Sequence, residues 1–161
     1  MINKLHLAMI ELYSGDAKRI QHFCKVHSYA KLIAETENVD EKCLFIIEAA
    51  ALTHDIGIHL CEEKYGNCNG KLQEKEGPAI AEKLLAKLGF DRDISDRVQY
   101  LIAHHHTYSN IDGIDYQILV EADFLVNIME DNLAKDAALK AYQNIFKTAC
   151  GKMICREMFG I

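Results

Sequence analysis

Proline, the residue that most strongly interrupts helices, occurs once in this chain, at position 78 of 161. No stretch alternates apolar and polar residues in the manner of a half-buried strand. The apolar residues instead recur at helical spacing, so the sequence predicts an all-α fold, a bundle of six or seven helices. We expect residues 1–161 to form a single domain, because a chain of this length builds one sizeable core.

Capping and breaking residues position the expected helices. Asp16 is expected to cap a long helix that reaches about residue 37, and Asp40 to cap a mostly apolar helix that reaches about residue 54. Polar residues and two glycines between positions 59 and 75 predict a long loop, of the kind that is often functional. Further helices are expected at about 4–13, 77–89, 91–106, 112–131 and 133–150, followed by a short docking tail.

The charge balance argues against one class of partner. A net charge of −6 lacks the basic footprint of a protein that binds a nucleic-acid polymer. No run of about 18 apolar residues predicts a membrane span, and the N-terminus lacks a signal-peptide pattern, so a cytoplasmic location is expected. The six cysteines lack the spacing of common structural zinc sites and are expected to be reduced thiols. The last helix and the tail are expected to pack on the bundle or on a second copy, as a homodimer.

Four polar features are out of place in a plain helical bundle. His27 lies on an apolar stripe, His54 and Asp55 end an apolar helix, three histidines at 104–106 close another helix, and Asp123 interrupts "ILVEADFLVNIM". Each histidine feature alone has an ordinary explanation, such as a core hydrogen bond or the dipole of a helix C-terminus. A buried carboxylate in mid-helix needs a partner, however, or it becomes protonated. One divalent cation would satisfy all four features together.

The order of these residues resembles the HD superfamily of metal-dependent phosphohydrolases. "HSYAKLIAE" is similar to the helix that carries the family's first histidine, "LTHDIG" to the motif that names it, and "VEADFLVNI" to the helix of its last aspartate. The resemblance covers about residues 16–130 and leaves a C-terminal helix and tail at 131–161. A subgroup of uncharacterised bacterial HD-domain proteins is more similar still, through "EKYGNCNGKLQEKEGP" and "HHHTYSNIDGIDYQILVEADFLVN".

This resemblance implies a set of metal ligands. Its motifs assign His27, His54, Asp55 and Asp123 to a first metal, and make Asp55 the bridge to a second one. Imidazole and carboxylate ligands suit several divalent ions, so the expected cofactor is one or two ions of iron, manganese, nickel, cobalt, zinc or magnesium.

Further residues are candidates for binding a second metal or for catalysis. Glu76 stands where the family usually has a histidine at the start of a helix, so a glutamate would have to bind the second ion. His104 and His105 are candidate second-metal ligands or catalytic groups beside Asp55, and helical facing favours His105. The lysine that often follows the HD motif is replaced by Ile58, which leaves Lys71 as a candidate phosphate contact.

The function implied by this resemblance is hydrolysis of a small phosphorylated metabolite or nucleotide by metal-activated water. Two alternatives stay open at this stage. One is a di-iron oxygenase on the same fold, and the other is a non-catalytic binding module whose metal only joins helices. Dioxygen consumption would identify the first alternative, and a closed coordination sphere would identify the second.

Overall fold

The computed structural model describes all residues, 1–161, and consists of helices without strands. This confirms the all-α prediction, although the number of helices exceeds the predicted six or seven. The nine helices are α1 (Ile2–Leu12), α2 (Ala17–Thr36), α3 (Glu41–Thr53), α4 (Ile58–Tyr65), α5 (Gly70–Leu88), α6 (Arg92–Ile102), α7 (Ile114–Glu130), α8 (Lys135–Asn144) and α9 (Ala149–Phe159).

The predicted N-caps of α2 and α3 are confirmed. The Asp16 carboxylate accepts a hydrogen bond from the backbone N–H of Arg19 at 3.1 Å, and Asp40 accepts one from Cys43 at 2.8 Å. Each cap satisfies one backbone donor that the first turn of a helix leaves without a partner. The starts of α2 and α3 are therefore determined by local sequence.

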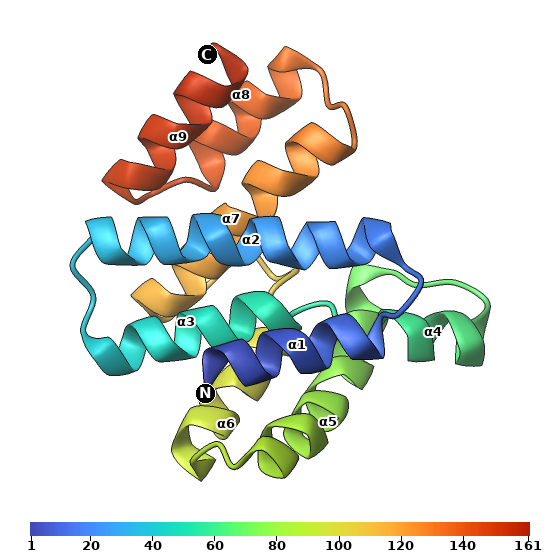
Figure 1. Cartoon of the computed structure of the whole chain (residues 1–161). Helices are drawn as coiled ribbons and strands as arrows, with labels where there is room; N and C mark the ends of the chain where they lie inside the picture. Colours follow the sequence, from blue (N-terminus) through green and yellow to red (C-terminus); the bar gives the residue numbers. More distant parts are fainter.

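Helix α3 forms the centre of the bundle. It packs against α1, α2, α6 and α7, and its last residues, from Ala49 to Thr53, are fully buried. Figure 1 shows α2 above α3 and in front of α7, and α1 partly in front of α3, with α5 and α6 at one end of the molecule and α8 and α9 at the other. Because α3 is surrounded by other helices, the residues that follow its last turn, His54 and Asp55, lie in the interior.

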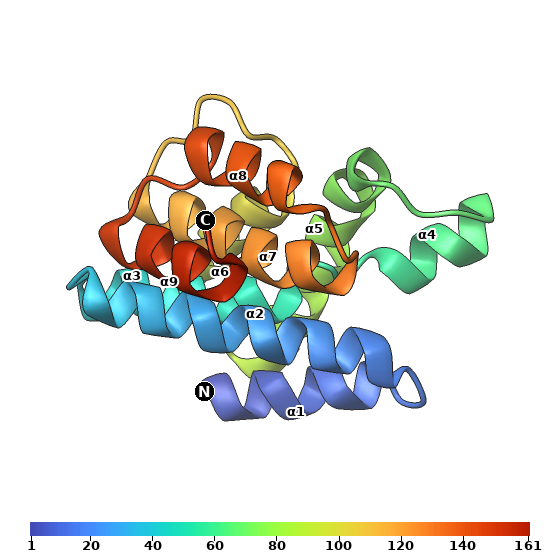
Figure 2. The same cartoon turned by 90° about the horizontal axis from the view of Figure 1, so that it is seen from above.

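Two expectations about the chain between and after these helices were wrong. The expected loop at 59–75 contains α4 and the first turn of α5, separated by Gly66 at φ +71°. Ile58 and Cys61, three residues apart, give α4 the buried side that holds it in place. Figures 1 and 2 show α4 extending from the side of the bundle.

The expected helix at 133–150 is instead two helices. The buried carboxylate of Glu121 accepts hydrogen bonds from the backbone N–H groups of Lys147 and Thr148, which interrupts helical pairing there. The side chain of Thr148 then caps α9 through the N–H of Gly151 at 2.9 Å. A buried acid on α7 therefore turns the chain, and α9 packs back onto α7 and α2.

Gly57, in the turn that follows α3, allows close packing between two segments of the chain. Its φ of −80° is open to any residue, so its backbone conformation does not require glycine. A Cβ at this position would lie 3.0 Å from the backbone nitrogen of Gly77 on α5. The absence of a side chain at Gly57 lets α5 approach the turn after α3 closely, and a Cβ at Gly77 would instead lie 2.7 Å from the side chain of Ile102 on α6.

The segment Glu41–Tyr65 is long and apolar enough to cross a membrane by length and composition. In the structure, 67% of its most apolar window is buried inside the protein, and a turn at residues 54–57 divides it into α3 and α4. These are the features of a core helix in a bundle. The cytoplasmic location stays a prediction.

Candidate metal centre

Four side chains from three elements converge at the end of α3. The Nε2 atoms of His22 and His54 lie 3.2 Å apart, and Oδ1 of Asp123 lies 3.2 Å from the first and 3.5 Å from the second. Oδ2 of Asp55 lies 3.5 Å and 3.6 Å from the same two nitrogens. Ligand atoms at about 2.1 Å from one ion are about 3.0–3.4 Å from one another, so this spacing fits a common ion.

Hydrogen bonds on the far side of each imidazole fix which nitrogen carries the hydrogen. Nδ1 of His54 lies 2.9 Å from the carbonyl oxygen of Ala51, and Nδ1 of His22 lies 3.0 Å from a carboxylate oxygen of Glu130. Both partners only accept hydrogen bonds, so each Nδ1 donates and each neutral ring turns the lone pair of Nε2 inward. That is the tautomer a metal ligand needs.

The cluster therefore brings lone pairs and carboxylate oxygens together without a donor between them. Oδ1 of Asp123 is buried and has no hydrogen-bond partner, although its side chain is 3% exposed. A buried carboxylate oxygen without a donor is costly. A cation among the four side chains removes that cost, so the donor set fits a divalent metal such as those expected from the sequence.

The pKa shifts of His54 and Asp123 also show that this cluster favours positive charge. Burial alone would lower the pKa of His54, but the carboxylates of Asp55 and Asp123 outweigh it and raise this pKa to about 9. Burial likewise opposes ionisation of Asp123, yet positive charge on the neighbouring imidazoles of His22 and His54 holds its pKa well below the usual range. Protons thus substitute for a cation at this cluster, and a metal has to displace them to bind.

Asp55 also faces a second group of candidate ligands. Its Oδ1 lies 3.6 Å from Nε2 of His105, and ligand atoms of Asp55, His105 and His106 lie within 4.8 Å of one another. Nδ1 of His105 lies 2.8 Å from the carbonyl oxygen of Ile102, which again directs the Nε2 lone pair inward. The two oxygens of one carboxylate therefore face two clusters, the arrangement expected of a bridge between two ions.

The first turns of α5 contribute a residue that sequence reasoning missed. Oε1 of Gln73 lies 2.8 Å from Nε2 of His106 and 3.3 Å from Nε2 of His105. Glu76, the expected second-metal ligand, instead accepts hydrogen bonds from Tyr65 and Lys64 on α4. Gln73 precedes Glu76 by three residues, nearly one helical turn. The sequence therefore indicated the correct helix for this contact but a residue one turn too far along it.

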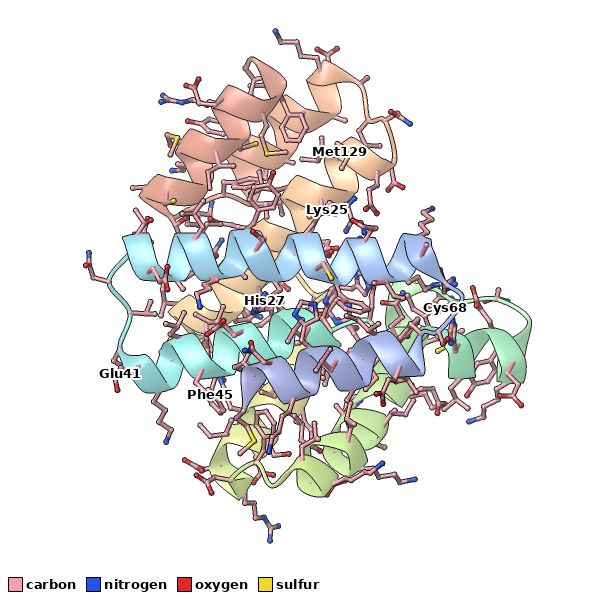
Figure 3. All side chains as sticks on the ribbon, viewed as in Figure 1. Lys25, His27, Glu41, Phe45, Cys68 and Met129 are labelled. Atoms are coloured by element: carbon pink, nitrogen blue, oxygen red, sulfur yellow. The ribbon has the colours of Figure 1, made fainter.

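The expected position of His27 beside the other ligands is also wrong. Its Nε2 lies 3.0 Å from Glu48, which is also bound by Lys31. Figure 3 shows His27 on the side of α2 that faces α3, while Lys25 lies on the edge toward α7. His22 takes the expected place, and its signal was the buried row that it forms at spacings of four, four and three residues with Val26, Ala30 and Ile33.

Two weaker candidates lie outside the cluster. Nδ1 of His104 lies 2.7 Å from the carbonyl oxygen of Tyr100, and its ring packs on that of Tyr100 at 4.3 Å between centroids. His104 therefore does not face the site, whereas His105 does. Lys71 is exposed on the first turn of α5 and does not line the adjoining cavity. The structure does not support a catalytic position for His104 or a phosphate contact for Lys71.

A polar cavity of about 500 Å³ adjoins the cluster. His22, Asp55 and Gln73 form its inner wall, so both groups of candidate ligands open onto it. Lys18 and Arg19 from the first turn of α2 line it as well. An opening with cationic side chains beside the cluster gives an anionic ligand access to it, and a site that only joined helices would be closed.

Glu130 is expected to control metal affinity through His22, because its carboxylate orients the imidazole and Lys25 holds that carboxylate at 2.5 Å. Glu130→Ala should lower metal affinity about 10- to 100-fold, the usual cost of losing such an outer partner. Titration of the chelator-treated protein with Zn²⁺ or Mn²⁺ in a calorimeter measures this. Glu130→Gln keeps an acceptor for His22 and should lose less, and unchanged affinity in Glu130→Ala would contradict the orienting role.

Comparisons with known proteins identify a matching family and a similar fold. The model of a family described as "HD domain" matches residues 19–148, most of the chain. Among solved structures, the fold is similar to the crystal structure of a predicted HD superfamily hydrolase from an uncultured Thermotogales bacterium. The TM-score is 0.70 at 24% identity, over 98% of this chain and 84% of the other. No curated protein matches the sequence.

Proposed function

The chain belongs to the HD domain family, whose members are generally metal-dependent hydrolases, and on that premise we propose that it is a metal-dependent phosphohydrolase. The proposed substrate is a small phosphorylated metabolite. The observation that carries the proposal is the unpartnered Oδ1 of buried Asp123, set among the Nε2 atoms of His22 and His54 at the end of an open cavity. The ligand roles of these residues are part of the proposal.

The proposed centre would hold its cation through His22, His54, Asp55 and Asp123. A divalent cation in such a site lowers the pKa of water toward about 7 and polarises a phosphoryl oxygen. The remaining work is positioning and charge neutralisation, which phosphoryl transfer chiefly requires.

In this proposal, different side chains neutralise the phosphate, hold a proton and orient the substrate. Lys18 and Arg19 neutralise phosphate oxygens at the cavity wall. His105 faces Asp55 through Nε2 and is placed to hold a proton for the leaving oxygen. The walls of the cavity orient the substrate so that its phosphorus lies next to the cluster.

A second candidate function is supported by one observation. The two oxygens of Asp55 face separate groups of candidate ligands, as a dinuclear centre needs. Two iron ions at such a centre would be compatible with the oxygenase alternative. Hydrolysis releases inorganic phosphate, whereas oxygenation consumes dioxygen. Each of these changes is easy to measure.

The test begins with elemental analysis of protein purified without added metal. The protein is then stripped with a chelator and reloaded separately with iron, manganese, nickel, cobalt, zinc or magnesium. We expect phosphate release from small phosphomonoesters only after reloading, because the stripped cluster holds protons in place of the cation. Dioxygen consumption without phosphate release would favour the oxygenase, and metal binding with neither activity would favour a binding module.

A further inference from the structure

On the basis of the proposed function, we propose that the substrate is a small, non-aromatic phosphomonoester. We infer that it carries hydroxyl or ammonium hydrogen-bond donors on the end opposite its phosphate. The observation is a division of charge within the cavity beside the candidate centre. One wall is formed by the first turn of α2 and the other by the last turn of α7 and its C-cap.

The wall formed by α2 is suited to phosphate. Lys18 is exposed there and forms no ion pair, so its ammonium group is available to an anion. Arg19 is held in place by Asp16 and Glu62, each 2.5 Å from one of its terminal nitrogens, and Glu62 of α4 lines the cavity beside it, which leaves Lys18 as the unpaired cation of this wall. The fixed guanidinium retains further N–H groups, and the N-terminus of a 20-residue helix adds partial positive charge.

The wall formed by α7 is suited to donors. Asn127, Glu130 and Asp131 line it and present amide and carboxylate oxygens near the negative end of the helix dipole. Glu130 is already engaged by Lys25 and His22, whereas exposed Asp131 forms no ion pair. A hydroxyl or an ammonium group satisfies this wall, and a second phosphate or a carboxylate would be repelled by it.

The cavity also lacks what a nucleobase requires. The imidazole of His22, committed to the candidate centre, is the one aromatic ring among its lining residues. The two apolar lining residues are Ile58 and Cys68, and Figure 3 shows Cys68 in the link between α4 and α5. Bases are generally recognised by stacking on aromatic side chains, so this cavity gives a base nothing to stack on. We therefore narrow the proposed substrate to exclude nucleotides.

Matched pairs of substrates test this inference on the metal-loaded protein. n-Propyl phosphate is glycerol 3-phosphate without hydroxyls, and ribose 5-phosphate is adenosine monophosphate without its base. We expect kcat/KM to be at least about tenfold higher for glycerol 3-phosphate or phosphoethanolamine than for n-propyl phosphate, and higher for ribose 5-phosphate than for the nucleotide. Equal values within both pairs, or preference for the nucleotide, would overturn the inference and leave the proposed hydrolase in place.

Asp131→Asn examines the donor wall directly. It should raise KM for the donor-bearing substrates several-fold and leave n-propyl phosphate unchanged, with a larger effect on phosphoethanolamine if the natural donor is ammonium. Asp136→Asn, on the exposed first turn of α8, removes the same charge outside the cavity and is the control. An equal effect of Asp131→Asn on every substrate would overturn the assignment of this wall.

Lys18→Ala examines the phosphate wall, and exposed Lys140→Ala is its control. Lys18→Ala should raise KM about equally for all phosphomonoesters, because they share the group that it binds. Unchanged KM for every substrate would overturn this part of the inference. Phosphate release from none of the substrates by metal-loaded protein would overturn the proposed function itself, and the substrate class with it.

Discussion

Asp123→Ala is expected to abolish metal binding and phosphate release together. The variant removes the oxygen that lies 3.2 Å from Nε2 of His22 and that has no hydrogen-bond partner of its own. Loss of the cation removes several kcal/mol of transition-state stabilisation, a fall in kcat/KM of about a thousandfold or more. Elemental analysis and phosphate release on the same preparation measure both effects.

Stability measurements separate this loss from misfolding. Metal at a thousand times its Kd stabilises the native protein by about 4 kcal/mol, so the wild-type Tm should rise when metal is added. Asp123→Asn keeps the shape of the side chain and should fold, yet its Tm should respond little to metal. Full metal content with full activity in Asp123→Ala would refute the ligand assignment.

His22→Ala and His27→Ala are expected to behave oppositely, although both histidines lie on α2 and both are largely buried. His22→Ala should lose metal and activity, since its Nε2 is central to the cluster. His27→Ala should keep both and lose only stability, by about 1–3 kcal/mol, because it leaves Glu48 with one partner fewer. Metal content and thermal unfolding of the two variants, measured side by side, give the answer.

The pair is its own control, because the same substitution is made twice on one helix. Retention of metal in His22→Ala with its loss in His27→Ala would restore the assignment made from the sequence motif. Loss of metal in both variants, with Tm lowered in both, would mean that α2 no longer packs, and His22→Gln would then replace the truncation. The latter keeps much of the volume of the imidazole and replaces its nitrogen by an amide, a weaker ligand for a divalent metal.

Much of the architecture could be predicted from local sequence. Asp16 and Asp40 cap the helices that they were expected to cap, and α3 is buried as its apolar composition indicated. The sequence did not predict the break between α8 and α9, because the carboxylate of Glu121 that causes it is 26 residues distant along the chain. Local pattern cannot anticipate a hydrogen bond made by a distant side chain.

Within the candidate site, the sequence identified residues whose burial is locally anomalous. Asp123 interrupts an apolar helix, and His54 and Asp55 follow a helix that is apolar nearly all round, so an interior position could be predicted from the sequence pattern. The structure brings these three together as expected. Their service as metal ligands stays a prediction that the variants above examine.

Only the tertiary structure decided which of several similar residues face the site. His22 and His27 are five residues apart, about 140° around a helix, and both fall within the wide face that α2 presents to α3 and α7. The close approach of Gly57 and Gly77 sets the depth of α5, so that Gln73 and not Glu76 reaches the histidines. The sequence by itself determined that an all-α bundle would carry histidines and buried aspartates at its centre. The rotation and depth of each helix, which packing alone fixes, decided which of them meet.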